Sequence, residues 1–355
     1  MQLERVVKLR SEMEKMSVDA FLITNPVNIF YLSGFTGDAG VALVTEDNQY
    51  LITDSRFGEQ IKSQVKYWSC EITREYLKTA CHLVTEKHLL AMAFEGSLSY
   101  NEYEVLDENA VSDIVAFDGV IEKLRSVKDT QEIALLRKSC SLAGLGYQKF
   151  LETVAKGQTE IEAANELDYI MKKLGAAESS FSTIVASGNR SSLPHGTASM
   201  RKLRQNDIVT LDFGYFYQGY TSDVTRTFSI GPQISDVRDT YQTVLRAQEK
   251  TIEAIRPGIT GSQLDRIGRS LITEAGYGKF FNHGMGHGIG MSIHELPNIG
   301  MGYEDILVPG QVITIEPGVY IPNKAGIRIE DDVLVTESGY EILTDFSKEY
   351  FEIKG

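Results

Sequence analysis

The sequence has few cysteines and no long apolar run. Its 355 residues include only Cys70, Cys81 and Cys140, none of them in Cys-x-x-Cys spacing. So sparse a set is typical of a reducing compartment and argues against a zinc ribbon or a disulfide scaffold. No apolar run approaches the roughly 18 residues of a membrane-spanning helix, and the first ten residues do not resemble a signal peptide. The expected location is therefore the cytoplasm.

Positive charge is also scarce. The chain carries 35 Lys and Arg against 49 Asp and Glu, which gives a formal net charge of −14. The longest cationic patch, residues 201–204, is typical of a solvated turn. A chain this acidic is poorly suited to nucleic acid or anionic lipid, so we expect neither as a partner.

A change of pattern near residue 125 divides the chain. Residues 1–125 mix short strands and helices, whereas a charged connection leads to a helix start at Asp129 or Thr130 with Glu132 in its first turn. A chain of this length commonly forms two domains. We therefore expect an α+β protein with domains 1–125 and 126–355.

The second section contains an internal repeat. Three pairs of residues keep one spacing of 101: Gly157 and Gly258, Thr159 and Thr260, Gly175 and Gly276. Each Gly-x-Thr is typical of a connection that ends one helix and caps the next, and each later glycine is typical of a helix end. The pattern predicts two similar halves.

Each half ends in a predicted hairpin with acids on its polar face. In the first, a turn centred near 217–218 makes Asp212 and Asp223 cross-strand partners, about 5 Å apart at Cβ. In the second, a turn centred near 323 places Glu316 close to Glu330. Taken singly, each acid is more often a solvated strand residue, but two such pairs repel unless a cation lies between them.

Histidines supply the remaining ligand type. His283, His287 and His294 lie in one glycine-rich stretch, and His195 lies in a comparable loop. Oxygen-rich ligation with imidazole suits manganese(II), cobalt(II), iron(II) or zinc. The sequence therefore predicts a site for two divalent ions, which together activate water and polarise a carbonyl.

These motifs resemble the pita-bread metallopeptidases of the creatinase/aminopeptidase family, in its Xaa-Pro aminopeptidase (aminopeptidase P) and Xaa-Pro dipeptidase (prolidase) branch. The resemblance covers nearly the whole chain, and it implies a mixed α/β creatinase-type domain followed by a pseudo-twofold pita-bread domain. The matching segments are Leu-Asp212-Phe-Gly, Tyr-Thr-Ser-Asp223-Val-Thr-Arg-Thr, His283-Gly-Met-Gly-His287-Gly-Ile-Gly, Ile-His294-Glu, Ile-Glu316-Pro-Gly-Val-Tyr320 and Gly-Ile-Arg328-Ile-Glu330-Asp-Asp.

The resemblance also implies a role for each site residue. The five metal ligands would be Asp212, Asp223, His287, Glu316 and Glu330, with Asp223 and Glu330 bridging two ions, manganese(II) above all. A hydroxide between the ions would attack the Xaa-Pro bond. The remaining residues would serve catalysis (Glu316 as proton shuttle, with His294 and His195) and substrate binding (His283, Tyr320 and Arg328).

Several functions share these motifs. We expect an Xaa-Pro aminopeptidase acting on peptides with proline at the second position; the alternative within the family is prolidase, which takes only dipeptides. A non-catalytic pita-bread module that binds peptides is the alternative of another class, although such members lose ligands. The family also implies a homodimer.

Overall fold

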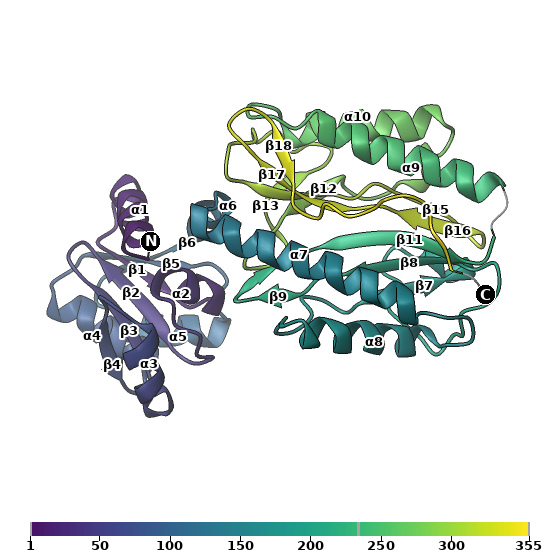
Figure 1. The fold of residues 1–355 in the computed structure, drawn as a ribbon. Coiled ribbons are helices and arrows are strands. Elements are labelled where there is room, and N and C mark those ends of the chain that lie inside the picture. Colours follow the sequence, from purple (N-terminus) through teal and green to yellow (C-terminus); the bar gives the residue numbers. More distant parts are fainter. Residues whose placement is uncertain (1, 233–234, 354–355) are drawn as a thin grey trace. The chain divides into compact units, whose positions relative to one another are not determined.

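The computed structural model describes residues 2–232 and 235–353 (Figure 1). The chain forms two compact units, one ending at Arg125 and one beginning at Ser126. Within the described residues, no helix is both long and apolar enough to cross a membrane.

The first unit is built on one six-stranded sheet in the order β4-β3-β2-β1-β5-β6. β1 runs antiparallel to β2 and parallel to β5, and β6 runs parallel to β5. The strands are β1 (Ala20–Ile23), β2 (Val41–Thr45), β3 (Gln49–Thr53), β4 (Ser69–Ile72), β5 (Ala91–Glu95) and β6 (Asp113–Phe117). The helices are α1 (Gln2–Met16), α2 (Pro26–Ser33), α3 (Gly58–Gln64), α4 (Tyr76–Glu86), α5 (Tyr100–Asn109) and α6 (Val120–Ser126).

The second unit contains two larger sheets, ordered β19-β11-β8-β7 and β13-β12-β14-β17-β18, and two small hairpins, β9–β10 and β15–β16. Its helices are α7 (Thr130–Thr153), α8 (Glu160–Lys173), α9 (Ser235–Glu253) and α10 (Gly261–Glu274). Its strands are β7 (Ile184–Ser187), β8 (Ile208–Phe213), β9 (Phe216–Tyr217), β10 (Tyr220–Thr221), β11 (Val224–Ile230), β12 (Gly286–Gly288), β13 (Glu295–Ile299), β14 (Val312–Ile315), β15 (Gly318–Ile321), β16 (Ala325–Arg328), β17 (Asp331–Val335), β18 (Tyr340–Ile342) and β19 (Glu352–Ile353).

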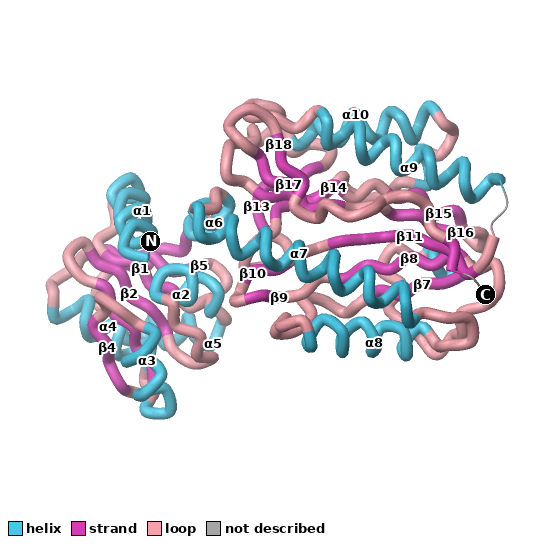
Figure 2. The backbone as a smooth tube through the Cα atoms, viewed as in Figure 1, coloured by secondary structure: helices cyan, strands magenta, loops and turns pink. Residues whose placement is uncertain are grey.

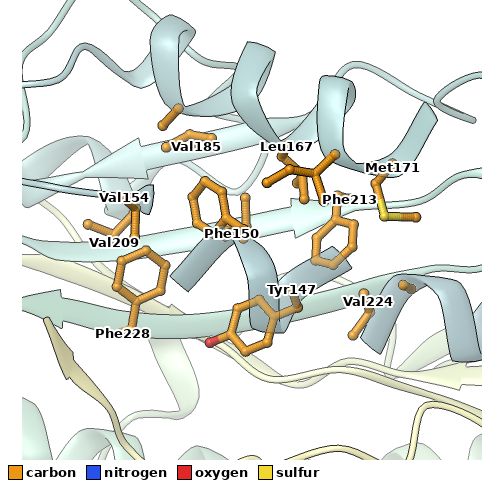
Figure 3. Packing of buried hydrophobic residues seen from close by; sticks show 14 of the residues in the cluster. Tyr147, Phe150, Val154, Leu167, Met171, Val185, Val209, Phe213, Val224 and Phe228 are labelled. Atoms are coloured by element: carbon orange, nitrogen blue, oxygen red, sulfur yellow. The ribbon is translucent and has the colours of Figure 1, made fainter. Parts of the chain in front are cut away.

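Each of the two larger sheets is covered by its own helix pair. Figure 2 shows the strands of the second unit between α9 and α10 on one side and α8 on the other. Side chains from α7 and α8 pack on β7, β8 and β11, where Phe150 of α7 meets Phe228 of β11 at 6.3 Å between ring centroids (Figure 3). A separate core joins α9 and α10 to β14 and β17. These cores pack against the strands of the two predicted hairpins.

The predicted repeat is confirmed. Thr159 and Thr260 each cap the helix that follows, and both caps are reciprocated by the residue three positions on. Gly175 and Gly276 both have positive φ, 103° and 88°, which favours glycine where a helix ends.

The second hairpin has the predicted register, whereas the predicted register of the first was wrong. Ile321 pairs with Ala325, so the second hairpin centres on residue 323 as expected. In the first, Asp212 pairs with Thr225 rather than with Asp223. The turn occupies Gln218 and Gly219, both with positive φ as in a two-residue hairpin loop, one residue later than expected.

This later turn moves each cross-strand partner by two residues. Asp223 therefore lies diagonally from Asp212, on the same face of the ladder. It immediately precedes the first residue of β11. Both acids still face the interior of the second unit.

Candidate metal and peptide site

One cavity of about 400 Å³ in the second unit brings the predicted site residues together. It lies where the two hairpins and the histidine-rich loop meet. Its lining includes His195, Asp212, Asp223, His283, His287, His294, Glu316, Tyr320, Arg328 and Glu330.

The tightest group of possible ligands is Asp223, His287 and Glu330. Each offers one ligand atom, and these atoms lie within 4.8 Å of one another. Glu316 joins the group through His287, whose Nε2 is 3.4 Å from Glu316 Oε1 and 3.6 Å from Asp223 Oδ2. One imidazole thus faces acids from both halves of the repeat.

The backbone fixes which nitrogen of His287 faces these acids. Nδ1–H donates to the carbonyl oxygen of Gly288 at 3.1 Å, and the amide of His287 donates to Thr314 Oγ1. Burial lowers the pKa of His287, which keeps the ring neutral. The lone pair therefore sits on Nε2, the arrangement usual for a metal-bound histidine.

Asp212 is held from one side only. Its Oδ2 accepts from Arg328 Nη2 at 2.5 Å, while its Oδ1 is buried without a hydrogen-bond partner in the described part of the chain. A buried carboxylate oxygen with no partner is costly in a protein interior. A cation at the centre of the cavity would satisfy it.

The pKa values of the cavity acids also indicate that a cation is needed. Burial, followed by the charges of Glu330 and Asp212, raises the pKa of Asp223 well above its usual range. Burial, followed by Glu316 and Asp212, does the same to the pKa of Glu330. Burial also raises the pKa of Glu316 to about 7. The four carboxylates of the cavity carry more negative charge than Arg328 can compensate. Their oxygen atoms are ligands that suit divalent ions.

A second set of contacts borders the ligands. Nδ1–H of His283 donates to the carbonyl oxygen of Gly284, so its Nε2 accepts from the Tyr320 hydroxyl at 3.0 Å. Arg328 Nη1 donates to the same hydroxyl at 2.7 Å and to the carbonyl oxygen of Pro194 at 3.1 Å. His283, Tyr320 and Arg328 thus form one hydrogen-bonded row that ends at Asp212.

The two remaining histidines are more open. His294 is exposed, and its ring lies 4.4 Å from the ring of His287. Partial burial and the neighbouring His287 lower the pKa of His294. His195 is exposed on the loop between β7 and β8. Both can reach a bound molecule without first breaking a hydrogen bond recorded among the described residues.

The sequence did not single out the supporting polar groups. Thr225 Oγ1 donates to Glu330 at 2.7 Å, and Asp332 Oδ2 accepts from the amide of Asp223 at 2.9 Å and from the buried Cys140 thiol at 3.3 Å. The later turn also makes Thr225 the cross-strand partner of Asp212. Further apolar residues line the cavity without a periodic signal in the sequence, namely Phe181, Ile184, Ile293 and Ile299.

Comparison with known proteins identifies the family. Residues 134–337 match metallopeptidase family M24, and residues 5–127 match the creatinase/prolidase N-terminal domain. The chain belongs to metallopeptidase family M24. It is therefore a metal-dependent peptidase with a creatinase-type N-terminal domain and a pita-bread domain, as its sequence predicted.

Relatives and solved structures span nearly the whole chain. An Xaa-Pro dipeptidase of Pyrococcus furiosus is 39% identical over 353 residues, 98% of this chain and 99% of that one. The structure of an Xaa-Pro dipeptidase from Bacillus anthracis superimposes with a TM-score of 0.97 at 38% identity and covers 99% and 100% of the two chains. An X-Pro aminopeptidase structure from Thermotoga maritima gives 0.91 at 35% identity, with 96% and 100% covered.

Proposed function

We propose that this M24 peptidase is an Xaa-Pro dipeptidase that hydrolyses the bond before proline in dipeptides. The observation that carries the proposal is the convergence of Asp223, His287 and Glu330, with Asp212 and Glu316 on the same cavity. The names of the relatives favour a dipeptidase over the aminopeptidase expected from the sequence. We also propose domains 1–125 and 126–355, with catalysis in the second.

Four acids and one imidazole of the cavity would hold the metal: Asp212, Asp223, Glu316, Glu330 and His287. We propose that the site would take two ions, manganese(II) above all, and that Asp223 and Glu330 would each serve as ligands to both. When bound, the ions supply an activated water and a Lewis acid for the scissile carbonyl. Xaa-Pro bonds suit such chemistry because proline lacks an amide hydrogen and its ring crowds the bond.

The chain's own residues would handle protons and orientation. Glu316 is the proposed proton shuttle, since its carboxylate lines the cavity beside His287, within reach of a water held there. His294 stands beside His287, where it can donate to the carbonyl oxygen as negative charge develops. His195 is proposed to contact the departing proline.

Substrate recognition falls to the row of His283, Tyr320 and Arg328. Arg328 is the guanidinium that lines the cavity, and it is buried. Its positive charge compensates Asp212, and we propose that it also attracts the free carboxylate of a dipeptide bound in the cavity. A dipeptide places its free carboxylate close to the scissile bond, whereas a longer peptide does not.

Peptide cleavage tests this proposal. The purified protein is loaded with manganese(II), and initial rates are compared for Ala-Pro, Ala-Pro-Gly and Ala-Ala. Cleavage of Ala-Pro alone supports a dipeptidase. Faster cleavage of Ala-Pro-Gly would instead establish an aminopeptidase, the activity for which the Thermotoga maritima protein is named. If none of the three peptides is cleaved although the metal content is full, a non-catalytic binding module is favoured.

A further inference from the structure

A charged pair on α10 lies outside the cavity, on the far side of the loop that carries His283. Arg269 Nε and Nη2 donate to the two carboxylate oxygens of Asp265 at 2.7 and 2.8 Å. Asp265 is buried, with 1% of its side chain exposed, whereas Arg269 keeps 19%. A bidentate pair of this kind holds the guanidinium in one orientation.

The guanidinium of Arg269 also donates hydrogen bonds to the backbone of the loop that carries His283. Arg269 Nη1 donates to the carbonyl oxygen of Phe281 at 3.0 Å, and Nη2 donates to that of His283 at 2.6 Å. The guanidinium carbon also lies 4.1 Å from the centroid of the Phe281 ring. Two carbonyls that flank an exposed residue, Asn282, are thereby tied to a helix.

Phe281 connects Arg269 to the His283 ring. Phe281 packs edge-on against that ring, with centroids 5.0 Å apart and planes at 90°. The ring in turn accepts from Tyr320, which accepts from Arg328. Arg269 therefore holds the backbone of His283 directly and contacts its ring through Phe281.

The first half of the repeat anchors its own histidine loop in a comparable way. Glu160, near the start of α8, is fully buried and accepts from the amides of Ser187 and Ser199, on either side of His195. In both halves, the helix after the Gly-x-Thr turn carries a charged side chain that binds backbone of the histidine-bearing loop. The recurrence argues that the contact serves the site.

We infer that Asp265 and Arg269 are positioning residues, which hold His283 against Tyr320 and thereby set how the cavity binds substrate. This inference rests on the proposed function, because His283 is assigned to substrate binding. It requires Arg269 to act through His283 and leaves the metal ligands unaffected.

A double-mutant cycle tests the inference. Arg269→Met, His283→Ala and the double variant are compared with wild type for kcat/KM on Ala-Pro and for manganese content. We expect Arg269→Met alone to lower kcat/KM about tenfold, mainly through KM, with metal content unchanged. In the His283→Ala background, it should change kcat/KM less than twofold. An equal loss in both backgrounds would overturn the inference, because Arg269 would then act independently of His283.

Two further variants separate positioning from folding. Arg266→Met is the matched control: Arg266 lines the same outer groove of α10, and no hydrogen bond recorded among the described residues joins it to the loop. It should leave kcat/KM unchanged. Asp265→Asn retains Arg269 but removes one acceptor charge, so it should give a smaller loss than Arg269→Met. If Arg269→Met does not fold, Asp265→Asn replaces it in the double-mutant cycle with His283→Ala.

A measurement without catalysis distinguishes failure of this inference from failure of the proposed function. Burial, helped by the charge of Arg328, lowers the pKa of His283 to about 4. NMR titration of its ring proton, assigned with His283→Ala, should show the pKa moving toward 6.5 in Asp265→Asn, which keeps the guanidinium charge that itself lowers this pKa. An unmoved pKa would overturn the inference, even if the protein cleaves no Xaa-Pro dipeptide.

Discussion

Neutralising Glu330 should stabilise the protein when metal is removed, although it should abolish metal binding. Glu330 is buried, and a ligand atom of its carboxylate lies within 4.8 Å of one from Asp223. Two unit charges at that distance repel by about 3.5 kcal/mol at an effective dielectric constant of ~20. Glu330→Gln removes this repulsion and retains an oxygen that can accept from Thr225.

The expected gain is smaller than the full repulsion, because the mutation also removes attraction to Arg328 and because the carboxyl is partly protonated. We expect Glu330→Gln to raise the free energy of unfolding in EDTA by about 1–3 kcal/mol at pH 8. The sign of its pH dependence follows from the raised pKa of Glu330. The wild-type carboxyl costs stability progressively above an unfolded pKa near 4.5, so the gain vanishes at lower pH.

Urea unfolding in EDTA at pH 5, 6.5 and 8 measures this effect, and the same series with manganese(II) measures metal stabilisation. Wild type should gain stability from manganese, whereas Glu330→Gln should gain little. A variant destabilised in EDTA at pH 8, or a gain that does not change with pH, would refute the reasoning.

The neighbouring Asp331 provides a control of opposite sign. It is equally buried, but it pairs with Arg226 at 2.8 Å and Lys348 at 2.7 Å. Burial raises its pKa, yet these cations outweigh burial and lower it overall. Asp331→Asn should therefore destabilise the protein by about 3 kcal/mol, with and without metal.

Three further predictions concern the histidines and their loops. His287→Ala should lower manganese content as well as turnover, measured by elemental analysis and kinetics on one preparation. His294→Ala should retain its metal, but its kcat should fall about 10²–10³-fold, because the hydrogen bond of His294 forms as charge develops in the reaction. If His294→Ala lost metal while His287→Ala kept a normal metal content, His294 rather than His287 would be the metal ligand. Glu160→Gln should lower stability by about 2 kcal/mol in urea and raise KM, since it loosens the loop that bears His195; an unchanged KM would contradict this.

Polar–apolar alternation and the repeated glycines predicted the two halves and the two pairs of acids, whereas the roles of His195, His283 and Tyr320 were implied by the family resemblance. The structure places all of these residues on one cavity. Alternation fixes which residues share a face, so the four acids faced inward even where the register was wrong. Register was harder to predict, because it depends on one turn. Gln218 adopts positive φ next to Gly219, and Gln is not a residue that signals such a turn.

The supporting contacts are long-range and leave no local signal. Asp332 reaches the amide of Asp223 across 109 positions of the sequence, and Arg328 reaches Pro194 across 134. Neither distance follows from periodicity. Such partners become visible only when the two hairpins are packed against each other.

The two halves also differ where a strict repeat would make them alike. The spacing of 101 pairs Glu160, the anchor of the first loop, with Gly261 rather than with another acid. A Cβ at Gly261 would lie 2.3 Å from the carbonyl oxygen of Asn298, so β13 leaves no room there for a side chain. The second half therefore anchors its loop from Arg269, two turns further along α10. The two anchors thus differ in residue and in charge, but both bind backbone beside a histidine, and the close approach of β13 leaves no side chain at the position equivalent to Glu160.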